Sequence, residues 1–63
     1  MKKIEAMREL TRLSDGTMAI LTGETNYSVL RIILNRWLNK IEAMDENAFQ
    51  NCENWMDVYN IIG

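Results

Sequence analysis

The chain has 63 residues, with a single cysteine and no histidine or proline, and its formal net charge at pH 7 is −2. A chain of this length forms one domain, residues 1–63, and buries only about 60% of the surface that its unfolded state exposes. Cys52 has no second cysteine to pair with, and one thiol without a histidine does not make a zinc site. Internal disulfides are therefore excluded, and we expect no metal and no cofactor.

The composition also argues against an enzyme. Acid–base and nucleophilic catalysis need a positioned base beside the reacting group, and Cys52 has no histidine to activate it. Gly16 and Gly23 are too far apart for a phosphate-binding loop and lack the lysine of a P-loop. We therefore expect a non-catalytic protein without a small-molecule substrate.

Large apolar residues occur in every segment, including two tryptophans and five methionines. This is more than so small an interior needs, and surplus apolar surface usually marks an interface, so we expect a homodimer. No run approaches the ~20 apolar residues of a membrane span. Charges at Glu5, Arg8 and Glu9 interrupt the N-terminal segment where a secretory signal would be apolar, so we expect a cytoplasmic protein that does not contact a membrane.

Charge is distributed unevenly along the chain. All seven basic residues lie within residues 1–40, whereas residues 41–63 carry five acidic residues and no basic one. Such a chain can meet an anionic partner, pair antiparallel with a copy of itself, or neutralise the two regions within one fold. The sequence leaves these three possibilities open.

The first half of the chain contains two predicted helices. Residues 2–13 fit an amphipathic helix whose apolar side carries Ile4, Ala6, Met7, Leu10 and Leu13, and Ser14–Gly16 supplies a stop signal. Residues 17–22, between the internal glycines, fit a short helix or a short extended piece. We favour the helix, because a lone strand would have no partner.

The second half contains two longer amphipathic patterns. With Thr25 or Asn26 as N-cap, a helix is predicted over residues 27–44. Its apolar arc includes Tyr27, Val29, Leu30, Ile33, Leu34, Trp37, Leu38, Ile41 and Met44, while Ile32 lies on the polar side. Asp45 is the expected N-cap of a last helix that runs to about Ile61, with Ala48, Phe49, Cys52, Trp55, Met56, Tyr59 and Ile62 on its apolar face.

The predicted fold is an all-α, small three-helix domain. The two long helices form an αα-hairpin, and an N-terminal helix with a short connecting helical turn completes it. An alternative is that the last two helices are one bent helix that pairs across a dimer. The sequence does not separate these two arrangements.

The favoured function is that of a small regulatory or adaptor protein. It would bind a protein partner through an apolar helical surface bearing aromatic residues, because tryptophan, tyrosine and methionine are enriched where helices bind other proteins. The residues expected to contact the partner are Ile32, Arg36, Trp37, Trp55 and Tyr59.

The alternative is a dimeric transcriptional regulator with a helix-turn-helix. Ala19, Gly23, Val29 and Ile32 occur at the spacings of that motif. The residues that would then face the DNA major groove are Asn26, Ser28, Arg31, Asn35 and Asn39. Thr22 and Glu24 stand where the motif generally packs apolar side chains, which counts against it. A third possibility is an oligomerisation module that has no other ligand.

Overall fold

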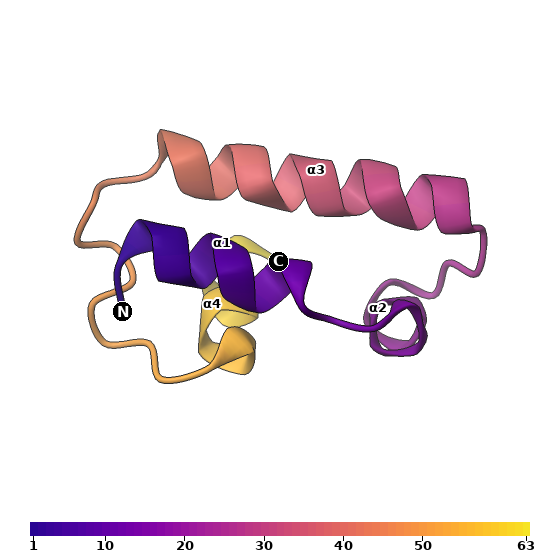
Figure 1. The fold of residues 1–63 in the computed structure, drawn as a ribbon, viewed down its shortest axis with the longest axis horizontal. Helices are drawn as coiled ribbons and strands as arrows, with labels where there is room; N and C mark the ends of the chain where they lie inside the picture. Colours follow the sequence, from indigo (N-terminus) through magenta and orange to yellow (C-terminus); the bar gives the residue numbers. More distant parts are fainter.

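The computed structural model describes residues 1–63 as four helices without any strand: α1 (Lys3–Thr11), α2 (Asp15–Thr22), α3 (Tyr27–Ala43) and α4 (Trp55–Ile62). α3 forms one long side of the molecule, α1 runs antiparallel beside it, and α4 passes behind α1 toward α3 (Figure 1). α1 packs against both α3 and α4, whereas α2 packs against α3 alone. The all-helical class is confirmed, but the last helix is shorter than predicted.

The hydrophobic core lies where α1, α3 and α4 meet. On α1 it is built from Ala6 and Leu10, both fully buried. Ile4, expected on this buried side, is instead 59% exposed. Residues two positions apart in a helix point roughly 200° away from each other. Because Ala6 faces the core, Ile4 therefore faces outward. The buried residues are Ala6, Leu10, Met18, Leu30, Leu34, Trp37, Ile41, Phe49, Cys52, Val58 and Ile62.

The segment Ser14–Gly16 starts α2 rather than stopping α1, which corrects the prediction. Ser14 is the N-cap, and its Oγ accepts a hydrogen bond from the backbone N–H of Thr17 at 3.1 Å. Asp15 and Gly16 form the first turn of α2. The prediction that residues 17–22 are helical is confirmed, and Met18 is the one residue of α2 that is buried.

α2 ends and α3 begins as the sequence indicates. Gly23 adopts the left-handed conformation with φ of 72°, which a residue without Cβ reaches at no steric cost. Asn26 caps α3, since its Oδ1 accepts from the N–H of Val29 at 3.2 Å. Tyr27, expected on the apolar arc, is 58% exposed because it lies in the first turn of α3, near the chain's bend.

The predicted last helix does not start at Asp45. Asp45 does accept from the N–H of Asn47 at 2.8 Å, but short turns follow, closed by Ala48 N–H to Asp45 O and Cys52 N–H to Phe49 O, both 3.0 Å. These bonds span three residues rather than the four of an α-helix. α3 and α4 are therefore joined by the long segment 44–54, and α1 packs against both of them. The predicted αα-hairpin, with a short turn between two long helices, is wrong.

The amino group of Met1 binds backbone carbonyls of the segment 44–54. It donates to the backbone carbonyls of Phe49 at 2.7 Å, Gln50 at 3.2 Å and Cys52 at 3.3 Å. These carbonyls turn toward a positive charge, and Phe49 between them is fully buried. These bonds join Met1 to a loop almost fifty residues away, and a bond from a charged donor stabilises more than a neutral one.

Two lysines bind the C-terminal ends of helices. Lys3 Nζ donates to the carbonyl of Glu42 on α3 at 2.8 Å, and Lys40 Nζ donates to that of Ile62 on α4 at 3.0 Å. The last carbonyls of a helix lack partners within it and carry partial negative charge, so cations are favourable there. None of the four helices has the length and apolar character that a membrane span requires.

Candidate functional site

Two aromatic side chains of α4 are only half-buried. Asn54 caps this helix through bonds from the N–H groups of Met56 at 3.0 Å and Asp57 at 3.3 Å to its Oδ1. A helix that starts here buries Val58 and Ile62. Trp55 and Tyr59 then lie at the edge of the buried stripe and remain half-exposed.

This start also corrects the expected apolar face of the last helix. Met56, expected inside, is 52% exposed, whereas Val58, which the expected face lacked, is fully buried. The expected face was drawn for a helix that continues unbroken from Asp45. Beginning at Trp55 instead selects Trp55, Val58, Tyr59 and Ile62, which follow the spacing of three and four residues.

The junction of α3 and α4 holds Tyr59 in place. Its ring meets Trp37 of α3 edge to face, with centroids 5.4 Å apart and an interplanar angle of 70°. Trp37 is only 7% exposed. Arg36 is exposed, but it lies one turn after Ile32 and roughly 100° from Trp37 around α3, so the structure does not bring it together with these aromatic residues. We call Trp37, Trp55, Met56 and Tyr59 the α3–α4 surface.

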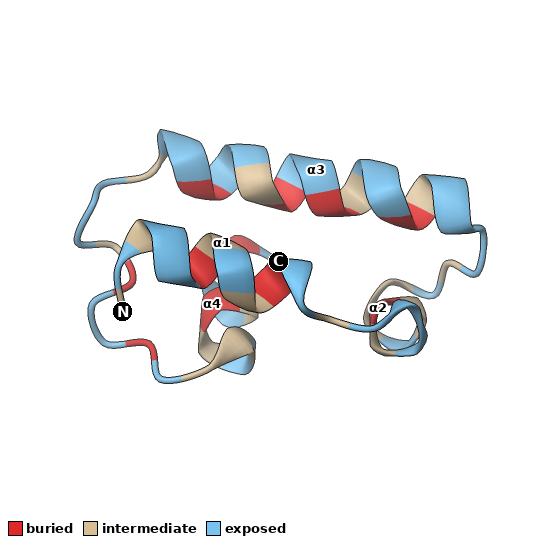
Figure 2. Cartoon of the chain, in the orientation of Figure 1, coloured by how far each residue is buried: buried red, intermediate tan, exposed pale blue.

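Ile32, like Arg36, was expected at the partner interface but lies apart from the α3–α4 surface. At 100° per residue it is separated from Trp37 by roughly 140° around α3, and it is 53% exposed. The side of α3 that faces away from α1 and α4 is mostly pale blue in Figure 2, and the exposure of Ile32 places it on such a side. We call this side the outer face of α3, formed by Ser28, Arg31, Ile32, Asn35 and Asn39, all of them exposed. The expected partner residues thus lie on two separate surfaces.

The structure places four of the five expected DNA-contacting residues on this outer face. The fifth, Asn26, is exposed but uses its side-chain oxygen to cap α3. α2, the turn at residues 23–26 and α3 follow one another as in a helix-turn-helix, and α2 is seen end-on where α3 runs across the view (Figure 1). Val29 and Ile32 are the two α3 residues at the spacings of that motif. Val29 is half-buried, whereas Ile32 is exposed.

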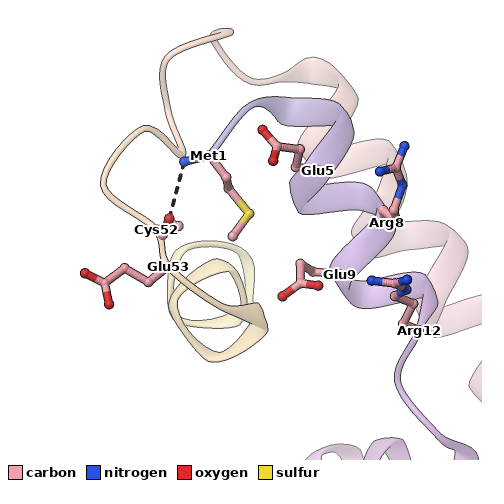
Figure 3. A pocket seen from close by; sticks show the side chains of 7 residues that line it. All are labelled: Met1, Glu5, Arg8, Glu9, Arg12, Cys52 and Glu53. Carbon is pink, nitrogen blue, oxygen red and sulfur yellow. Dashed lines mark hydrogen bonds between the residues drawn. The ribbon is translucent and has the colours of Figure 1, made fainter.

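A hollow of about 280 Å³ lies between α1 and residues 52–53 (Figure 3). Its charged lining is mixed, with Arg8 and Arg12 beside three glutamates, Glu5, Glu9 and Glu53. Glu53 points away from α1 in this view. No three carboxylate or thiol groups converge in a way that could hold a metal ion. Because its lining mixes both charges, the hollow does not favour a small anion over a small cation.

Cys52 lies beside this hollow and is 9% exposed. Burial raises the pKa of its thiol above the ordinary value, and the negative charge of Asp57 raises that pKa further, while the Met1 ammonium opposes both. The thiolate is the nucleophilic form of cysteine. A raised pKa therefore keeps Cys52 in its less reactive form.

No protein-family model matches the chain, and neither the curated proteins nor the solved structures include a significant match to it.

Proposed function

We propose that this protein is a small non-catalytic regulatory or adaptor protein that binds a protein partner through the α3–α4 surface. The observation that carries the proposal is the half-exposed pair Trp55 and Tyr59 beside the exposed Met56 on one short helix. Tryptophan and tyrosine are among the residues that dominate the energetics of protein interfaces, and both types lie on this surface.

The contact between Tyr59 and Trp37 supports the proposal further. A ring held edge to face by a buried neighbour has lost much of its rotational freedom before any partner arrives. Ordering a free side chain on binding costs about 0.5–1.5 kcal/mol, so a fixed ring contributes more of its contact energy to affinity. Met56 adds a flexible apolar side chain that adapts to the partner's shape.

The test compares two exposed apolar residues on different surfaces. Met56 and Ile4 are 52% and 59% exposed, so Met56→Glu and Ile4→Glu add the same charge at similar exposure. We expect Met56→Glu to abolish enrichment of a specific protein from extracts of the source organism, and Ile4→Glu to retain it. Titration of that purified protein should repeat the difference. Equal enrichment by both variants, or none that depends on Met56, would overturn the proposal.

We also propose that the chain forms a homodimer. Only 11 of its 63 residues are buried, and Ile4, Ile20 and Ile61 are exposed in addition to Ile32. A second copy that covers part of this surface would stabilise a small domain by mass action. Light scattering across a dilution series should show the dimer mass at high concentration, whereas a monomer throughout would overturn this part of the proposal.

DNA binding through the outer face of α3 is the second candidate function. It is favoured by the exposure of Ser28, Arg31, Asn35 and Asn39 along one helix that follows a glycine turn. Fluorescence anisotropy with duplex DNA at low and moderate salt tests it. Binding that weakens steeply with salt and is lost in Asn35→Ala would support this candidate, and the absence of binding at low salt would remove it.

A further inference from the structure

The outer face of α3 carries opposite charges at its two ends. Arg31 lies near the start of the helix and Glu42 near its end, and both are exposed. They are separated by eleven residues, which is close to three whole turns, so they lie on one line along the helix. Their separation along the axis is roughly 16 Å at 1.5 Å per residue. Asp45 and Glu46 add negative charge just beyond that end, and both are exposed.

A narrow seam runs beside these charges. Ser28, Ile32, Asn35 and Asn39 follow one another at spacings of four, three and four residues, which is the spacing of a helix–helix contact line. Ile32 is the only large apolar residue in the seam, and it is 53% exposed. α1 and α4 lie on the opposite side of α3, so the seam is uncovered in the single chain (Figure 2).

We propose that the occupant of this seam is α3 of a second copy, packed antiparallel about a two-fold axis near Trp37. This inference rests on the proposed self-association and specifies where the two copies meet. In this register Asn35 of one copy lies opposite Asn39 of the other, and amide groups can both donate and accept hydrogen bonds. Arg31 of one copy lies beside Glu42 of the other, and the symmetry makes each contact twice.

Charge selects this occupant over DNA. Antiparallel packing brings each arginine to the acidic end of the other helix and also sets the two helix dipoles head to tail. A DNA backbone laid along the same face would meet Arg31 and Arg36, but also Glu42, Asp45 and Glu46, whose charges repel phosphates. The acidic end is thus unfavourable for DNA and favourable for a second copy.

Sedimentation velocity of purified protein from micromolar to millimolar concentration measures the self-association. We expect Arg31→Glu and Glu42→Arg each to weaken it by roughly tenfold or more, because two attractive pairs become repulsive. An equimolar mixture of the two variants, and the chain that carries both changes, should recover it. Rising salt concentration should weaken the wild-type dimer.

Matched controls reverse charges away from the seam. Arg8→Glu on α1 and Glu53→Arg before α4 alter exposed residues and the net charge by the same amounts, and should leave self-association unchanged. Circular dichroism verifies that every variant is folded.

The outcomes separate the two levels of the proposal. A dimer that ignores both reversals, or that is not recovered by the mixture, overturns the α3 pairing and leaves the proposed self-association standing. A wild-type monomer up to millimolar concentration overturns both. Duplex DNA binding that Glu42→Arg strengthens, without any self-association, would assign the face to DNA instead.

Discussion

Trp37 on α3 and Tyr59 on α4 meet edge to face, with ring centroids 5.4 Å apart. The contact joins a buried residue to a half-exposed one, so the same ring that completes the core also forms part of the α3–α4 surface. The carbonyl of Tyr59 accepts from the N–H of Gly63 at 2.7 Å. The end of α4 is therefore fixed through both the side chain and the backbone of one residue.

Replacing Tyr59 separates the contribution of the ring from that of the hydroxyl. We expect Tyr59→Leu to lower the free energy of unfolding by about 0.5–1.5 kcal/mol beyond the change in buried area, since aromatic pairs contribute this much. Tyr59→Phe keeps the ring and should remain close to wild type. Urea denaturation followed by tryptophan fluorescence measures both. An equal loss in the two variants would show that the hydroxyl, not the ring contact, is the stabilising group.

The two internal glycines should respond to alanine with opposite signs. Gly23 has φ of 72°, so Gly23→Ala should destabilise the protein by about 1–2 kcal/mol through left-handed strain. Gly16 lies within α2 with no neighbour nearer than 3.9 Å to an added Cβ. Gly16→Ala should therefore stabilise the protein by about 0.5–1 kcal/mol. Thermal melts of both variants give the comparison, and shifts of the same sign would contradict it.

Asn54 should determine where α4 begins. Asn54→Ala removes the acceptor for two helix N–H groups and should cost about 1 kcal/mol, whereas Asn54→Asp keeps an acceptor and should cost little. Asn60→Ala, an exposed change within α4, is the control. Denaturant midpoints rank the three, and a loss in Asn60→Ala as large as that in Asn54→Ala would argue against a capping role.

The free amino group of Met1 should stabilise the segment 44–54. In a chain that begins at Met1, adding residues before it turns the ammonium into a neutral amide with one N–H. The three carbonyl contacts then cannot all persist, and a loss of about 1.5–3 kcal/mol is expected for hydrogen bonds to a charged group. Hydrogen exchange at the Cys52 amide should accelerate. Lys2→Gln removes a neighbouring charge without touching these bonds and should leave exchange unchanged.

Cys52 makes the stability depend on pH in the alkaline range. Its folded-state pKa is raised by burial and then by Asp57, so the folded chain holds the thiol proton to a higher pH than the unfolded chain. The resulting stability is fully present below the ordinary cysteine pKa, about 8.5, and is lost as the pH rises through the folded value. When the pH is raised from neutral to alkaline, the urea midpoint of the wild type should fall further than that of Cys52→Ala. Parallel falls would contradict the assignment to Cys52.

The sequence predicted α3 almost to its ends, but it predicted a helix where turns precede α4. The apolar pattern of α3 runs for many turns behind a capping asparagine, Asn26, so its local signals agree. The segment after Asp45 also has helical spacing at Ala48, Phe49 and Cys52. Its carbonyls instead contact Met1, and no local pattern contains information about a residue that distant. The cap that does start α4, Asn54 with Asp57 three residues later, was present in the sequence as a helix start signal.

The candidate site was predictable residue by residue but not as a surface. Trp37, Trp55 and Tyr59 were expected on apolar faces, and each lies on one. Which of them remains accessible depends on how α1 and α4 pack against α3, and this buries Trp37 while leaving Tyr59 half-exposed. Ile32 fitted the apolar arc poorly from the start, and its exposure on the outer face agrees with its place opposite the core.

The position of α1 has a consequence for how the chain is made. α1 is synthesised before α3 and α4, yet it packs against these two helices rather than against its sequence neighbour α2. Ala6 and Leu10 are therefore not fully covered until α3 and α4 have both left the ribosome, and closing so long a loop carries an entropic cost. Folding should then occur in one step near the end of synthesis instead of helix by helix. A chain interrupted before α4 would present its first helix to whatever apolar surface it meets.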